Sequence, residues 1–208
     1  MKCIRVDRIE LAPDARIWTA QPVTAIDMVA TPPGLQPTAY IQNSWADRPY
    51  GRITPLRVAA IHDGEMLAIR LSWKPVGGGN PDFPDAAAIA LPVSGDPVLG
   101  LMGAPDAPIH LLRWQTHHDG GELIRSILAE GIGSTRPGPE IKRRVGVRRH
   151  DGLIDIVIAR TLGQGAGAAP LLAGKTTKIG FAVWDGGNEE RAGIKAFSGD
   201  WIDLALDA

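Results

Sequence analysis

The fold class is decided by the stretch Leu56-Arg57-Val58-Ala59-Ala60-Ile61-His62-Asp63-Gly64-Glu65-Met66-Leu67-Ala68-Ile69-Arg70-Leu71-Ser72-Trp73. An Asp-Gly pair between two apolar-rich runs of this kind is among the strongest short-range signals for a β-hairpin. The same signal recurs at Asp151-Gly152, which leads into the apolar run 153–160. Residues 178–184 have the composition of another buried strand. These segments predict antiparallel β-structure.

The rest of the chain extends this pattern. Its 25 glycines and 17 prolines are spread along most of the sequence, as expected where turns separate short strands every ~8–12 residues. Helical periodicity is scarce: Gly121–Gly131 could form about three turns and Pro84–Ala90 one or two. Residues 74–84 and 163–174 resemble long loops. We therefore expect one all-β domain over residues 1–208, an antiparallel β-sandwich with loop insertions and one or two short helices.

Composition excludes several classes of partner. The net charge is −1, which does not favour nucleic acid or an acidic membrane surface. No apolar run approaches the ~20 residues that span a bilayer. The N-terminal residues lack the apolar core of an export leader, which favours the cytoplasm. One local run of basic residues is expected to be a solvated strand or loop rim rather than a docking patch; it contains Lys142, Arg143, Arg144, Arg148 and Arg149.

Motifs for catalysis are absent from the sequence. It contains no nucleophile elbow, no phosphate loop and no zinc-ligand spacing. Cys3 is the single cysteine, so the chain cannot form an internal disulfide, hold an iron–sulfur cluster or attach a haem covalently. The adjacent acids Glu189 and Glu190 are expected to lie solvated in a turn. The six tryptophans are expected mainly to fill the core, although some could stack on a flat sugar or porphyrin.

Several segments, in this order, together resemble one known family. They are the Trp18 region, Gly51-Arg52-Ile53, the hairpin 58–73, Phe83–Pro92, Leu101-Met102-Gly103, Ile109–Trp114, Gly131–Ser134, residues 151–162, Phe181–Gly186, Glu190-Arg191-x-Gly193-Ile194-Lys195 and Trp201. The family is that of the haem b-binding gamma subunits of ethylbenzene dehydrogenase, dimethylsulfide dehydrogenase and chlorate or selenate reductase. The resemblance covers about residues 18–206. One departure is His110, which stands where an apolar residue would be more comfortable.

The resemblance implies a cytochrome b domain with a fold like that of carbohydrate-binding modules. It implies one non-covalent haem b, with Met102 and Lys195 as the axial ligands of the iron. It also implies a heterotrimer in which an iron–sulfur subunit and a molybdenum-cofactor catalytic subunit are the partners, and in which this chain relays single electrons to or from an external carrier. Exported members of the family have a leader, so the resemblance favours the periplasm if a leader was removed or a partner carries one.

The two ligand positions have ordinary alternatives in the local sequence. Met102, between small and apolar residues, could fill a gap in the core. Lys195, in Gly193-Ile194-Lys195-Ala196-Phe197, could be an exposed lysine on an edge strand. A lysine that binds iron must be neutral, which burial favours. An arginine could not replace it, because a guanidinium stays protonated.

Two other functions fit the same residues. A carbohydrate-binding sandwich without a cofactor would use tryptophans to stack on sugars, and Met102 and Lys195 would have no special proximity. A stand-alone haem carrier would keep the cofactor and lack the molybdenum partner.

Overall fold

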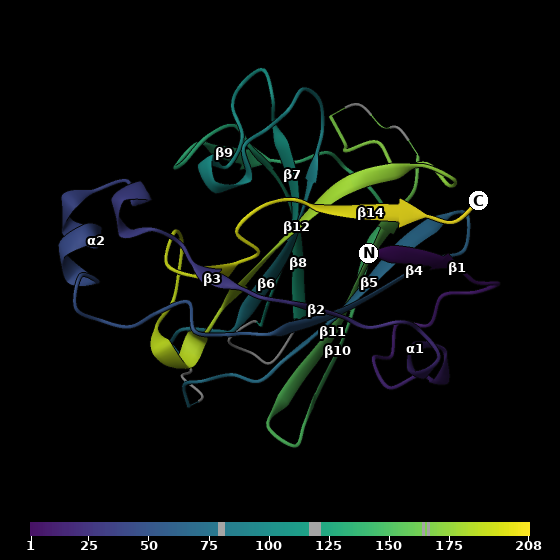
Figure 1. The fold of residues 1–208 in the computed structure, drawn as a ribbon, viewed down its shortest axis with the longest axis horizontal. Helices are drawn as coiled ribbons and strands as arrows, with labels where there is room; N and C mark the ends of the chain where they lie inside the picture. The colour runs from purple at the N-terminus through teal and green to yellow at the C-terminus, as the bar shows by residue number, and fades with distance from the viewer. Residues whose placement is uncertain (79–81, 117–121, 164, 166) are drawn as a thin grey trace.

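The computed structural model describes the chain except for residues 79–81, 117–121, 164 and 166. The strands pair in one continuous order that divides into two sheets at β12, and Figure 1 shows their arrangement. The first sheet has the order β10-β11-β5-β4-β1-β14-β12, with β2 beside the start of β4. Its strands are β10 (Arg143–His150), β11 (Leu153–Thr161), β5 (Met66–Trp73), β4 (Leu56–His62), β1 (Lys2–Arg5), β14 (Ile202–Leu206), β12 (Thr176–Trp184) and β2 (Thr24–Ile26).

The second sheet begins where β12 leaves the first. Its order is β12-β6-β7-β8-β9, and β13 and β3 extend it on the other side of β12. Its further strands are β6 (Ala86–Pro92), β7 (Ile109–Thr116), β8 (Glu122–Ala129), β9 (Thr135–Pro137), β13 (Ala196–Phe197) and β3 (Val29–Ala30). Among the described strand pairs, β1 is parallel to β4 and β14, and the others are antiparallel.

The core lies between the two sheets. Leu71 and Ile156 of the first sheet and Ile89 and Leu112 of the second belong to one buried cluster. Strand β12 joins the sheets, because residues 176–179 pair with β14 and residues 180–184 pair with β6. These observations confirm the predicted all-β sandwich. The prediction of one domain over residues 1–208 stays a prediction.

Both hairpins marked by Asp-Gly are present as expected. Strands β4 and β5 pair from Arg57–Ser72 to His62–Leu67, and β10 pairs with β11 around Asp151-Gly152. Asp63 closes the first turn by accepting hydrogen bonds from the backbone N–H groups of residues 65 and 66. Side chains of this kind stabilise turns in preference to helix or sheet.

The two segments predicted as helices are strands. Most of the described part of Gly121–Gly131 is β8, and most of Pro84–Ala90 is β6. Short apolar runs fit the period of a helix as well as that of a strand. Strands β6 and β8 pair with the two edges of β7, and in β6 this pairing overrides the helix propensity of the alanines. The short helices lie elsewhere. They are α1 (Arg16–Thr19), α2 (Ala39–Ser44) and the 3₁₀ turns η1 (Pro33–Leu35), η2 (Leu99–Leu101) and η3 (Gly186–Asn188).

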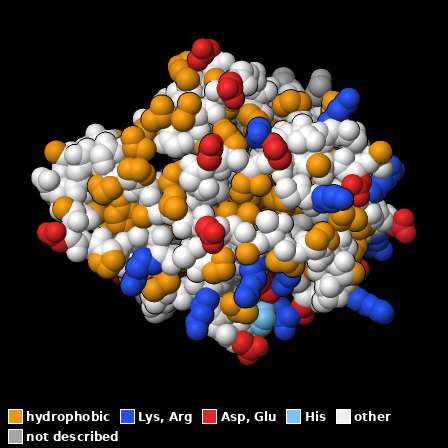
Figure 2. Space-filling view, in the orientation of Figure 1, with side chains coloured by type: hydrophobic (Ala, Val, Ile, Leu, Met, Phe, Trp, Pro, Cys, Tyr) orange, Lys and Arg blue, Asp and Glu red, His pale blue; other side chains and the backbone are white. Residues whose placement is uncertain are grey.

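The remaining sequence expectations concern loops and surface. Within residues 74–84 and 163–174, the described parts belong to no helix or strand; residues 79–81, 164 and 166 lie outside the described chain. Figure 2 shows Lys and Arg side chains gathered along the lower edge, where Figure 1 places the β10–β11 hairpin. Arg144 and Arg148 of this hairpin are exposed, and Arg148 pairs with Asp14 at 3.4 Å. None of the described helices is long and apolar enough to cross a membrane.

Candidate functional site

A platform of small side chains covers the outer face of the second sheet. Successive residues of a strand point to opposite faces, so on β6 Ala87 and Ile89 enter the core while Ala88 and Ala90 point outward. Ala182 of β12 lies beside Ala88 on the same face. Methyl groups cannot fill the space above them. The sheet therefore presents a flat, apolar floor.

Four connecting segments enclose the space above this floor. The cavity has a volume of about 350 Å³ and continues into a smaller space of about 40 Å³. Its walls come from the segment after β3, from the segment that contains η2, from the turn between β8 and β9, and from the turn before β13. The residues shared by both spaces are Thr31, Ala88, Gly100, Met102, Leu111, Trp184 and Lys195. The larger volume lies at the lower end of the range for small-molecule sites.

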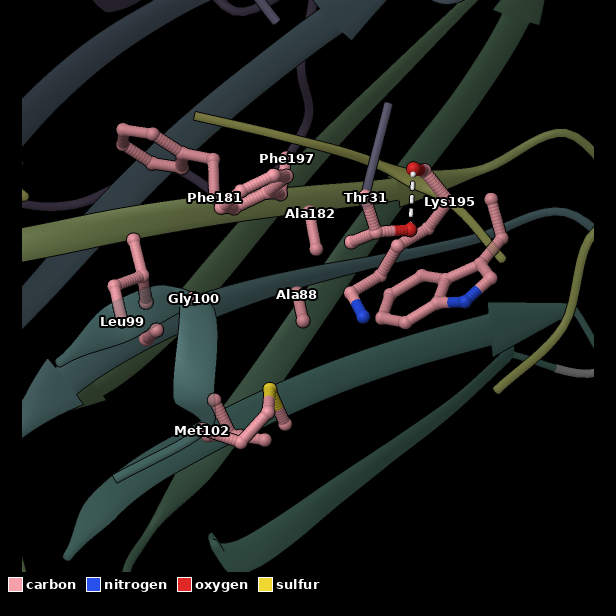
Figure 3. A pocket seen from close by; sticks show the side chains of 12 residues that line it. Thr31, Ala88, Leu99, Gly100, Met102, Phe181, Ala182, Lys195 and Phe197 are labelled. Atoms are coloured by element: carbon pink, nitrogen blue, oxygen red, sulfur yellow. Dashed lines mark hydrogen bonds between the residues drawn. The ribbon is translucent and has the colours of Figure 1, made fainter. Parts of the chain in front are cut away.

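The segment at η2 directs Met102 into the cavity. Met102 ends this turn in the left-handed conformation, with φ 61°, which few residues other than glycine adopt. Its backbone N–H donates to Leu99 O at 3.0 Å, and its carbonyl accepts from Gly131 N at 3.0 Å. Figure 3 shows the Met102 sulfur pointing into the cavity. The backbone thus fixes the direction of the thioether.

Lys195 enters from the opposite wall. Its backbone carbonyl accepts from Thr31 N at 3.1 Å and from Thr31 Oγ1 at 3.3 Å, and Figure 3 draws the latter bond. The side chain is 8% exposed, and Nζ lies 5.7 Å from the centre of the Trp184 ring. No hydrogen bond or ion pair reaches Nζ from the described residues. Burial lowers the pKa of this amine to about 8.

A buried carboxylate holds the turn before Lys195. Glu190 was expected to be solvated with Glu189, but it is 3% exposed. It accepts hydrogen bonds from Gly51 N at 2.8 Å and from Asp185 N at 3.0 Å. Burial raises the pKa of Glu190. The sequence prediction fails because these backbone donors come from distant segments and replace water around the carboxylate.

Gly51 permits the close approach of these segments. A Cβ at Gly51 would lie 2.6 Å from the Ala30 Cα and 2.8 Å from the Lys195 carbonyl, and Gly51 has φ +62°. Only glycine fits this position without displacing its neighbours. Gly51 and Glu190 therefore position the wall that carries Lys195.

The structure brings the two predicted ligand residues together. Met102 and Lys195 line the same cavity, and Figure 3 shows the ends of both side chains directed into the space above Ala88. Lys195 is buried in a turn, so the alternative of an exposed lysine on an edge strand is wrong. A soft thioether, an amine without a hydrogen bond and a flat apolar floor fit a planar apolar ligand that contains a metal. Ligation itself stays a prediction.

His110, the departure noted in the sequence, lies on the other side of the sheet. It is fully buried and contacts Arg160, with Nη1 to Nδ1 at 3.3 Å, and Ser126 Oγ, at 2.9 Å from Nε2. An arginine only donates, so Nδ1 is the acceptor and Nε2–H donates to Ser126. Burial and the charge of Arg160 lower the pKa of His110 to about 4. This cluster supports the core and does not line the cavity.

Several lining residues were not predicted. The segment Thr31–Pro37 closes one side of the cavity, where the Gln36 amide donates to Gly193 O at 3.2 Å and its buried Oε1 has no hydrogen-bond partner among the described residues. Arg113 lines the outer end. Trp184 also lines the cavity, whereas Trp18, Trp73 and Trp114 are buried in the packed clusters. The alanines of β6 were a usable signal, but their outward face depends on pairing that the sequence does not show.

Fold and cavity together define a β-sandwich with an apolar cavity on the outer face of one sheet. Solved structures share this fold: a family 9 carbohydrate-binding module from Caldicellulosiruptor kristjanssonii, in complex with glucose, has a TM-score of 0.54 at 9% identity over 100% of this chain and 95% of that one. The same module with cellotriose also has a TM-score of 0.54, at 8% identity over 100% and 94%. No protein-family model matches the chain.

Relatives found by sequence similarity indicate the family more specifically than the shared fold does. The chain is 32% identical to the chlorate reductase subunit gamma of Ideonella dechloratans, over 93% of this chain and 78% of that protein. It is 27% identical to the dimethylsulfide dehydrogenase subunit gamma of Rhodovulum sulfidophilum, over 91% and 73%. A Haloferax mediterranei protein provisionally named as a respiratory nitrate reductase haem subunit is 29% identical over 91% and 66%. This chain belongs to the family of the chlorate reductase and dimethylsulfide dehydrogenase gamma subunits.

Proposed function

We propose that this chain is the electron-transfer subunit of a multi-subunit oxidoreductase and binds one haem b in the cavity, with Met102 and Lys195 as axial ligands. The observation that carries the proposal is the convergence of these two side chains on one apolar space. The relative named as a haem subunit supports the choice of cofactor. A haem with both axial positions filled exchanges one electron at a time and has no vacant site for substrate.

The chain's own residues have distinct parts in this function. Ala88, Ala90 and Ala182 provide the flat floor. Lys195 must lose its proton to offer a lone pair, and burial makes this loss easier because the charged form is poorly solvated there. A thioether ligand tends to raise the reduction potential of a haem relative to nitrogen ligands.

The partners follow from the family. The gamma-subunit relatives support an assembly with a catalytic subunit. We infer a heterotrimer in which a molybdenum-cofactor subunit carries out catalysis, and in which this chain passes electrons between an iron–sulfur subunit and an external carrier. Co-purification of both subunits with tagged native protein tests this arrangement. A stand-alone haem carrier would purify without them.

Absorption spectroscopy tests the site itself. The refolded or native protein with haem b should give the spectrum of a six-coordinate, low-spin haem, and Met102→Ala and Lys195→Ala should each abolish that coordination. Met66→Ala and Lys178→Ala are matched controls, because neither residue lines the cavity and Lys178 pairs with Asp203 at the surface, at 2.7 Å. Both controls should keep the wild-type spectrum.

Two outcomes would contradict the proposal. Absence of a Soret band from the wild-type protein would rule out haem binding and favour the carbohydrate-binding alternative. An unchanged low-spin spectrum in either cavity variant would show that the substituted residue is not a ligand and that the proposed pair is wrong.

A further inference from the structure

Two arginines lie side by side at the outer end of the cavity. Arg113 on β7 and Arg125 on β8 are directly opposite each other in the antiparallel pair, so their side chains leave the same face of the sheet. That face also carries Leu111 and Ile127, which line the cavity two residues away along each strand. Arg113 itself lines the cavity, and Arg125 lines a hollow that meets it at Ile127 and Thr135.

In the described part of the chain this pair of like charges has no ion-pair partner; Glu140, which lines the same hollow as Arg125, pairs with Arg143 at 3.9 Å instead. Among the described residues, no carboxylate forms an ion pair with Arg113 or Arg125, and the described lining of the cavity contains no Asp or Glu. Opposed like charges on a sheet are destabilising. Burial, and then the charge of Arg125, lower the pKa of Arg113. An anion placed at this end would relieve the repulsion.

The Arg113 guanidinium is held toward the ligand space by Trp184. Its central carbon lies 5.1 Å from the centre of the Trp184 ring, within range of a cation–π contact. The Trp184 indole is in turn fixed by donating from Nε1 to Ala192 O at 3.0 Å. The same ring faces the Lys195 amine at 5.7 Å. Arg113 is therefore the fixed cation of the cavity, because Lys195 must be neutral to bind a metal.

We propose that Arg113, assisted by Arg125, binds the carboxylate groups of the cavity's ligand and so fixes which edge of the ligand faces outward. This inference rests on the proposed function, in which these groups are the two propionates of haem b. A guanidinium binds a carboxylate through two parallel N–H···O bonds, which determines orientation as well as affinity.

The test compares haem b with its dimethyl ester, in which both propionates are uncharged. Each is titrated into wild-type apo-protein and into Arg113→Gln, and binding is followed at the Soret band. We expect Arg113→Gln to weaken haem b binding by about 10- to 100-fold, the range for one hydrogen-bonded charged pair, and to leave ester binding unchanged. Arg148→Gln is the matched control, because it removes the same charge from a distant surface strand.

The outcomes separate this inference from the proposed function. If Arg113→Gln weakens the binding of haem b and of the ester equally, Arg113 has a purely structural role. If it weakens the binding of neither, Arg113 is not part of the site. Both results overturn the inference, whereas a low-spin spectrum of the wild-type protein would still support the haem proposal. Failure of the wild-type protein to bind either ligand overturns both. Circular dichroism of the variant confirms that it folds, and Arg113→Lys should recover part of the affinity for haem b only.

Discussion

His110 makes the stability of the folded protein depend on pH. The pKa of His110 is about 4 in the folded protein and ~6.5 in an unfolded chain. Between these values the unfolded state binds the extra proton, so the contribution of His110 is fully present above pH 6.5 and is lost as the pH falls toward 4. From His110 alone we expect a loss of about 2–3 kcal/mol in the free energy of unfolding of the apo-protein between pH 7.5 and 4.5. Urea denaturation at the two pH values measures it.

The variant His110→Gln isolates this effect from the other groups that titrate in the same range. Its amide can still accept from Arg160 and donate to Ser126, but it does not titrate. The pH-dependent loss should therefore be smaller by about the same 2–3 kcal/mol in the variant. An identical pH profile for both proteins would show that burial and Arg160 do not keep His110 neutral.

Alternate side chains of strand β6 face the core and the cavity. Ala87 is fully buried between the sheets, and Ala88 faces the cavity. Because adjacent residues point to opposite faces, Ala87→Leu should overpack the core and cost ~1–3 kcal/mol of stability. Ala88→Leu should leave the apo-protein folded and weaken haem binding at least tenfold. Thermal unfolding and Soret titration of the two variants measure the contrast, and a reversed result would show that the face assignment is wrong.

The same strand shows what sequence reasoning could and could not supply. The hairpins were predictable because Asp-Gly turns and alternation are local signals. The alanines of β6 suggest helix by propensity, and only pairing with β7 and β12 makes them a floor. Met102 and Lys195 were found through family resemblance, since nothing local distinguishes Met102 from a core methionine. Arg113 was missed because its importance depends on what lies across the sheet.

Unfolding of the whole sandwich can be monitored through the thiol of Cys3. Cys3 is fully buried in β1, which pairs with β4 and β14, and burial raises its pKa to about 12. A buried, protonated thiol is unreactive, so labelling by a thiol reagent at pH 8 should require opening of the first sheet. The free energy of opening from labelling rates should equal that of global unfolding from circular dichroism. A markedly lower value would show that β1 detaches before the rest unfolds.

The cavity lies outside the packed core, and this position bears on how the protein matures. If the pocket lay between the two sheets, the protein would need its ligand in order to fold. Here the core between the sheets and the cavity lie on opposite faces of the second sheet, so we expect the polypeptide to be able to fold first and receive the proposed prosthetic group later. A cell short of that group would then accumulate finished scaffolds ready for loading, not misfolded chains marked for destruction.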